Sequence, residues 1–122
     1  MSYIDGFVLA VPHAKKEEYR RMAAKVAGLF REFGALDVAE NWGDNVPHGK
    51  TTDFYMATKA KEDENVLFSW ITWPSKEVRD AAWEKMMADD RMKPDGDMPF
   101  DGQRMFWGGF EPLDLTMEME AA

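Results

Sequence analysis

Cysteine is absent from the 122-residue sequence, and histidine occurs only twice. Without cysteine the chain cannot form disulfides, thiolate zinc sites or cysteine nucleophiles. No apolar run approaches the roughly 20 residues that a membrane-spanning helix needs. The N-terminal stretch MSYIDGFVLAVP has no basic region of the kind that marks a signal peptide. We therefore expect a cytoplasmic protein with no membrane partner.

An excess of basic residues is also missing, because 15 Lys and Arg stand against 23 Asp and Glu for a net charge of −8 at pH 7. Nucleic-acid binding draws most of its affinity from basic side chains that neutralise phosphates, so we expect no nucleic-acid partner. The 45% hydrophobic and 13% aromatic content instead predicts a packed core. The length favours a single domain over residues 1–122.

Hydrophobic periodicity and the positions of Pro and Gly predict the order of elements along the chain. We expect strands at residues 3–11, 36–42, 53–59, 66–73 and 104–110, helices at 14–33 and 76–88, and loops at 43–50 and 89–102. Ser75 is the expected N-cap of the second helix. This order is typical of the ferredoxin-like split β-α-β fold of the α+β class, an antiparallel sheet with two helices on one face.

The strands expected at 3–11, 66–73 and 104–110 carry bulky apolar side chains on both faces. Two helices can cover only one face of the sheet, so something else must cover the other. A second copy that places the same face against the first would do so, which predicts an isologous homodimer in which two sheets form a shared barrel. In the alternative, loops of the same chain fold over that face.

Five segments carry a family resemblance: DGFVLAVP (5–12), HGKTTDF (48–54), FSWITWPSKEVRD (68–80), DDRM (89–92) and PFDGQRMFWGGFEP (99–112). They resemble the DUF1428 family of small bacterial proteins, and the resemblance covers nearly the whole chain. That family is similar to the dimeric α+β barrel group, so the resemblance implies the same dimeric architecture. The group includes cofactor-independent monooxygenases, haem-degrading enzymes and proteins without a known ligand, so the resemblance implies no particular activity.

Recognisable catalytic motifs are missing from the sequence. It has no phosphate-binding Gly-rich loop, no G-x-S-x-G turn, no H-E-x-x-H helix and no metal-ligand spacing, so we expect no cofactor and no metal. His13, where the first strand meets the first helix, is a candidate general base, or else a plain exposed residue. Asp5 and Arg104 are charges on apolar strands expected to be neighbours. We predict that they form an ion pair, either structural or able to transfer protons at a cavity.

Trp42, Trp70 and Trp107 lie on or at the ends of expected strands. They are candidates for lining an apolar cavity that takes a small planar ligand, and the alternative is that they pack in the core or the dimer interface. Three hypotheses of function follow. The first is a small-molecule-binding homodimer, the second a cofactor-independent oxygenase or isomerase, and the third a structural or regulatory dimer without a ligand.

Overall fold

The computed structural model describes residues 2–94 and 96–121, which form one four-stranded antiparallel sheet. Its strands are β1 (Tyr3–Pro12), β2 (Asp37–Trp42), β3 (Glu64–Trp73) and β4 (Phe106–Phe110). They lie in the spatial order β2-β3-β1-β4, so the first and last strands are neighbours. This is the ferredoxin-like α+β arrangement that the order of elements predicts.

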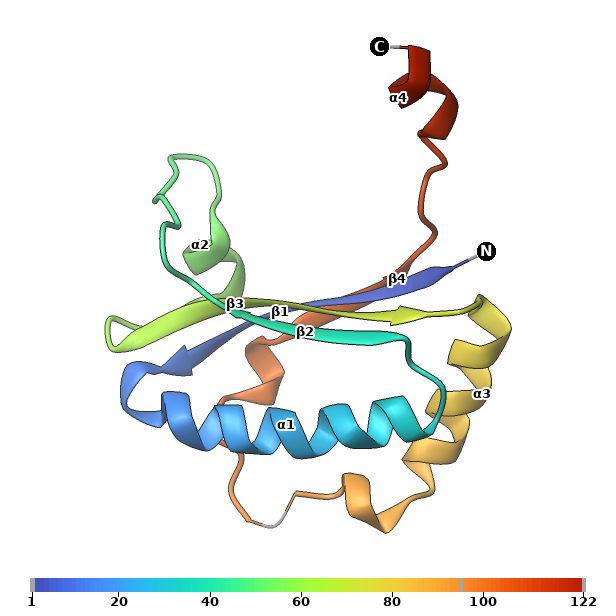
Figure 1. Cartoon of the computed structure of the whole chain (residues 1–122). Coiled ribbons are helices and arrows are strands. Elements are labelled where there is room, and N and C mark those ends of the chain that lie inside the picture. Colours follow the sequence, from blue (N-terminus) through green and yellow to red (C-terminus); the bar gives the residue numbers. More distant parts are fainter. Residues whose placement is uncertain (1, 95, 122) are drawn as a thin grey trace.

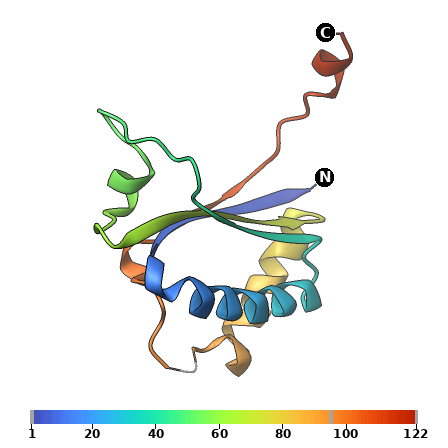
Figure 2. The ribbon, with the colours of Figure 1, turned by 60° about the vertical axis from the view of Figure 1, so that its left-hand side comes forward.

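The two longest helices, α1 (Lys16–Glu32) and α3 (Lys76–Met87), cover the same face of the sheet (Figures 1 and 2). The face that they cover is called here the helix side. The opposite face, called here the open face, has no long helix over it in the described part of the chain (Figure 1). The short helix α2 (Phe54–Thr58) rises at one end of the open face, and α4 (Thr116–Ala121) stands away from the sheet (Figure 1).

The core lies between the sheet and the two helices. One cluster of buried side chains consists of Leu9, Val11, Tyr19, Ala23 and Leu67, and a second of Phe30, Ile71, Trp73, Ala82 and Met86. Burial of each large apolar side chain contributes about 1.5–3 kcal/mol. These clusters fix α1 and α3 against the sheet and so position the residues between them.

The strand expected at residues 53–59 is wrong, because this segment forms the helix α2. The Asp53 carboxylate accepts a hydrogen bond from the Met56 backbone N–H at 2.6 Å, which is an N-cap. Lys59 ends the helix in the left-handed conformation with φ of 53°. Two local caps therefore outweigh the β-forming character of Phe54 and Tyr55.

The other expected elements are present with shifted ends. A 3-10 turn, η1 (His13–Lys15), precedes α1, and two further 3-10 turns, η2 (Asp90–Met92) and η3 (Gly102–Arg104), lie in the expected 89–102 loop or at its end. Within that loop, Asp95 lies outside the described residues. The last strand begins at Phe106 rather than Arg104, because Arg104 is the last residue of η3 and Met105 ends that turn.

Residues 2–94 and 96–121 form no helix with both the length and the apolar character needed to cross a lipid bilayer.

Candidate functional site

A cavity of about 620 Å³ lies between the helix side of the sheet, α1 and residues 91–94 and 96–105. It is called here the helix-side cavity. Its walls are mainly apolar and include Phe7, Met22, Phe30, Phe100 and Met105. A concave site of this size with few polar groups is typical of small-molecule binding sites.

One group of polar side chains lines the cavity, and it is called here the polar corner: Tyr19, Glu40 and Ser69. The Tyr19 hydroxyl and the Ser69 hydroxyl each donate a hydrogen bond of 2.6 Å to Oε1 of Glu40. Glu40 on β2 is directly opposite Ser69 on β3, so the sheet register brings them together. Tyr19 reaches them from the first turn of α1.

The chemistry of the polar corner is that of a hydrogen-bond acceptor. Burial, followed by the negative charge of Glu40, raises the pKa of Tyr19, so its hydroxyl stays protonated and remains a donor. Both hydrogen bonds end on Oε1 of Glu40. Glu40 is exposed, and among the described residues no donor is bonded to its Oε2, so this oxygen is open to solvent and to a donor from a ligand.

Charged side chains also line the mouth of the helix-side cavity. Arg91 is held by carboxylates on both sides: it pairs with Glu32, and its Nη2 lies 2.7 Å from Oδ2 of Asp89. Lys93 pairs with Asp90 at 3.0 Å. Since these two cations already have carboxylate partners, they are poor candidates for the recognition of an anionic ligand.

Asp5 lies on the helix side of β1 and is fully buried. Its carboxylate accepts hydrogen bonds from Nη2 of Arg79 at 2.8 Å and from the indole N–H groups of Trp73 and Trp83 at 2.9 Å each. With all its partners supplied by the protein, the carboxylate is enclosed. It does not line the helix-side cavity that the described residues form.

The predicted ion pair between Asp5 and Arg104 is therefore wrong. The strand register places Gly109, not Arg104, opposite Asp5, and Arg104 lies before β4 in η3. The true partner, Arg79, is on α3, four residues before Trp83 in the sequence. That i, i+4 spacing puts both donors on one helix face, and it was the signal available for this contact.

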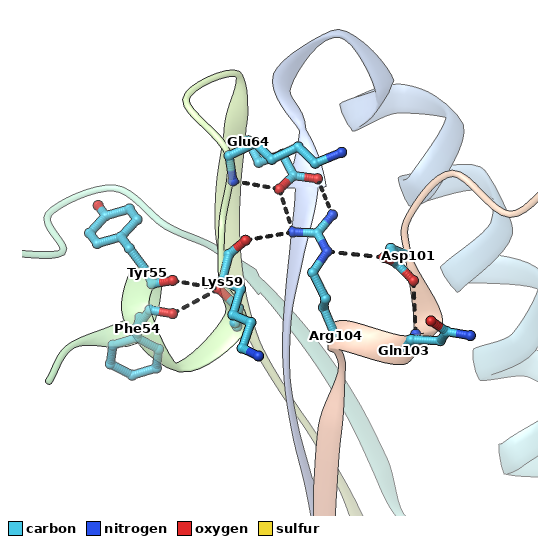
Figure 3. A network of polar contacts seen from close by, with 9 residues as sticks. Phe54, Tyr55, Lys59, Glu64, Asp101, Gln103 and Arg104 are labelled. Carbon is cyan, nitrogen blue, oxygen red and sulfur yellow. Dashed lines mark hydrogen bonds and ion pairs between the residues drawn. The ribbon is translucent and has the colours of Figure 1, made fainter.

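Arg104 instead makes a bidentate ion pair with Glu64, in which Nη1 and Nη2 each lie 2.7 Å from a carboxylate oxygen (Figure 3). Its Nε donates to Asp101 at 3.1 Å and its Nη1 to the backbone carbonyl of Lys59 at 2.9 Å (Figure 3). The Arg104 guanidinium lowers the pKa of Glu64 to about 2. This network fastens η3 to the start of β3 and to the end of α2.

The remaining candidate residues do not meet in one place. His13 is exposed at the start of the first helical turn, and its ring packs edge-on against Trp42 at 6.0 Å. Trp42 lines a neighbouring pocket of about 320 Å³, which shares Tyr19 and Glu40 with the helix-side cavity. The Trp70 indole points to the opposite side of β3 from Ser69 and packs edge-on against Phe68 at 5.5 Å on the open face, whereas Trp107 stacks on Trp83 with ring centroids 5.9 Å apart. Of the three tryptophans, only Trp70 borders the helix-side cavity within the described part of the structure, and its ring lies on the other face of the sheet.

A second concave region lies on the open face and is called here the open-face groove. It measures about 580 Å³, and its lining includes Ile4, Val8, Phe68, Trp70, Phe106 and Phe110. These three phenylalanines are substantially exposed: the exposed fraction is 47% for Phe68, 45% for Phe106 and 60% for Phe110. Contiguous apolar surface of this kind is typical of an interaction site.

Comparison with known proteins gives the family. The family model described as "Protein of unknown function (DUF1428)" matches residues 2–102. The uncharacterized protein YbaA of Escherichia coli (strain K12) is 64% identical over 114 residues, which cover 93% of this chain and 97% of YbaA. The uncharacterized protein YbaA of Shigella flexneri is similar to the same extent, with 64% identity over 114 residues. The chain therefore belongs to the DUF1428 family, as the resemblance of its segments predicts.

Proposed function

We propose that this protein is a cytoplasmic homodimer that binds a small molecule in the helix-side cavity of each copy. The observation that carries the proposal is the polar corner, a carboxylate held by two hydroxyl donors at the wall of an apolar cavity of about 620 Å³. Few, well-placed polar groups in an apolar pocket are what fixes the orientation of a small ligand.

The lining of the cavity limits the class of ligand. Phe7, Phe30 and Phe100 favour an apolar, planar body. The Glu40 carboxylate, with Oε1 already accepting two hydrogen bonds, favours a hydroxyl or N–H donor on that body. The proposed ligand is thus an aromatic or other flat apolar molecule with at least one hydrogen-bond donor.

The homodimer is supported by the open face. Its exposed phenylalanines and the open-face groove give a large apolar surface that a second copy would remove from water. An isologous pair, in which each copy presents the same face, is the commonest way for one chain to bury such a surface. The helix-side cavity lies on the other face of the sheet and stays accessible in that dimer.

A calorimetric titration with 2-naphthol tests the binding proposal, since this probe is planar, apolar and carries one O–H donor. Met22→Trp should weaken binding, because Met22 lines the cavity and the larger indole occupies part of its volume. Gly28→Trp is the matched control: it adds the same side chain to α1 at a position where a Cβ would meet no atom of another element within 4 Å. Equal loss of binding in both variants, or unchanged binding in Met22→Trp, would contradict the proposal.

The role of the polar corner is tested with a second probe, 2-methoxynaphthalene, which has nearly the same shape but no donor. Loss of one hydrogen bond to a charged acceptor should weaken binding by roughly tenfold or more. Equal affinities for the two probes would show that Glu40 does not recognise a donor on the ligand.

A further inference from the structure

Residues 111–121, called here the C-terminal arm, leave the end of β4 and rise on the open side of the sheet (Figures 1 and 2). Its apolar side chains are exposed to an unusual extent: 82% for Leu113, 54% for Leu115, 80% for Met117 and 72% for Met119. Its backbone bonds stay within the arm, as from the Met119 N–H to the Leu115 carbonyl at 2.9 Å. We propose that the arm packs against α2 of a second copy and clasps the homodimer, an inference that rests on the homodimer proposed above.

The arm is long enough to reach a second copy. Five residues, 111–115, lie between the end of β4 and the start of α4, and in extended form they span about 17 Å. Two sheets that pack face to face lie about 10 Å apart. The first turn of α4 can therefore pass the contact plane between the sheets and lie beside the body of the other copy.

The positions of the arm and of α2 on the open face determine which part of a second copy the arm can contact. The arm rises at one end of this face, and α2 with the loop before it rises at the other end (Figures 1 and 2). A two-fold axis that exchanges the two ends brings the arm of each copy next to α2 of the other. A two-fold axis along the strands would instead bring α2 against α2, and these projections would hold the sheets apart.

The chemistry of the two surfaces agrees with this arrangement. On α2, the exposed fractions of Phe54 and Met56 are 37% and 45%. These side chains offer an apolar surface to Leu113 and Leu115, and flexible Met side chains on both partners can adjust to fill the gaps. Contact between them would bury apolar surface that each copy alone leaves in water.

Cross-linking tests the contact directly, because the natural chain has no cysteine. Met56→Cys and Leu115→Cys are each introduced into a differently tagged copy, and the two copies are co-expressed and treated with a short bismaleimide. We expect the product that joins the two tags. A product that joins two copies of Leu115→Cys would overturn the inference, because the arm would then meet the other arm.

Sedimentation separates the failure of this inference from the failure of the homodimer. Leu113→Gln with Leu115→Gln should raise the dimer dissociation constant at least about 100-fold, since both arms lose apolar contact. The control, Glu118→Gln with Glu120→Gln on the same arm, should leave the constant unchanged. A wild-type dimer that resists the leucine substitutions overturns only the arm contact, whereas a wild-type monomer overturns the homodimer as well.

Discussion

Asp5 is a carboxylate removed from water and surrounded by donors from other elements. Arg79 pairs with it, and the guanidinium lies over the rings of Tyr3 at 5.3 Å and Trp107 at 5.9 Å. A buried charge is tolerated only when it is paired and its remaining hydrogen-bonding sites are filled. The cluster thus connects β1, the end of β3, α3 and β4 through one side chain.

Asp5→Asn should destabilise the fold by about 3 kcal/mol, because the largely buried Arg79 loses its buried counter-charge and keeps only the half-exposed Asp80. Trp83→Phe removes one donor and should cost about 1–3 kcal/mol. Urea unfolding followed by circular dichroism measures both. Arg20→Ala, which breaks an exposed pair with Glu17, is the control and should change stability little. A value for Asp5→Asn close to that of the control would contradict the structural role.

Glu64 makes stability depend on acid pH. Its pKa is about 2 in the fold against an ordinary value of 4.5, so its contribution, about 3 kcal/mol, is complete above pH 4.5 and is lost as the pH falls towards 2. Glu64→Gln should therefore be less stable than wild type at pH 7, and the difference should close between pH 4.5 and 2. Urea titrations across this range test it, with exposed Glu62→Gln as the control. A gap that is independent of pH would contradict the ion pair with Arg104.

For single residues, the sequence indicated that a buried charge requires a partner, but it did not indicate which residue the partner is. An aspartate within an apolar strand indicates a buried charge that requires a cation, and Asp5 is one. Arg104 was not the partner because the register of β1 with β4 pairs Asp5 with Gly109, five residues from Arg104, and the cation comes from α3 instead. The same dependence on register hid Glu40 and Ser69, which become neighbours only through the pairing of β2 with β3.

Helix ends decided which elements were predicted correctly. Ser75 was recognisable as an N-cap, and its hydroxyl accepts from the Val78 N–H at 3.2 Å at the start of α3. Asp53 caps α2 in the same way, but the aromatic and alternating character of the next residues indicated a strand. A helix of only five residues gives too short a pattern for its period to be read from sequence.

Ser75→Ala should cost about 1 kcal/mol, because the cap of α3 is lost and the Val78 N–H is left without its acceptor. Ser75→Asp, which keeps an acceptor at the same place and adds a favourable charge at the helix N-terminus, should restore stability. Thermal unfolding compares the three proteins. The capping role would be refuted if alanine were as stable as aspartate at this position.

For the whole molecule, the proposals give the two faces of the sheet different roles: ligand binding on the helix side and dimer contact on the open face. The apolar character of both strand faces was visible in the sequence and led to the expectation of a dimer. The helix-side cavity was not visible in the sequence, because it forms where residues 91–94 and 96–105 cover α1 and the sheet. That closure depends on Phe100 packing edge-on against Tyr19 at 5.8 Å and on the anchoring of Arg104 to Glu64.

The most direct test of the proposed binding site is a ¹H–¹⁵N correlation spectrum of the protein during titration with 2-naphthol. The account predicts that the amide shifts concentrate around the polar corner, at Tyr19, Glu40 and Ser69, and at Phe100. Shifts that instead concentrate on the open face, at Phe68, Phe106 and Phe110, would contradict it. So would a spectrum that does not change at saturating probe.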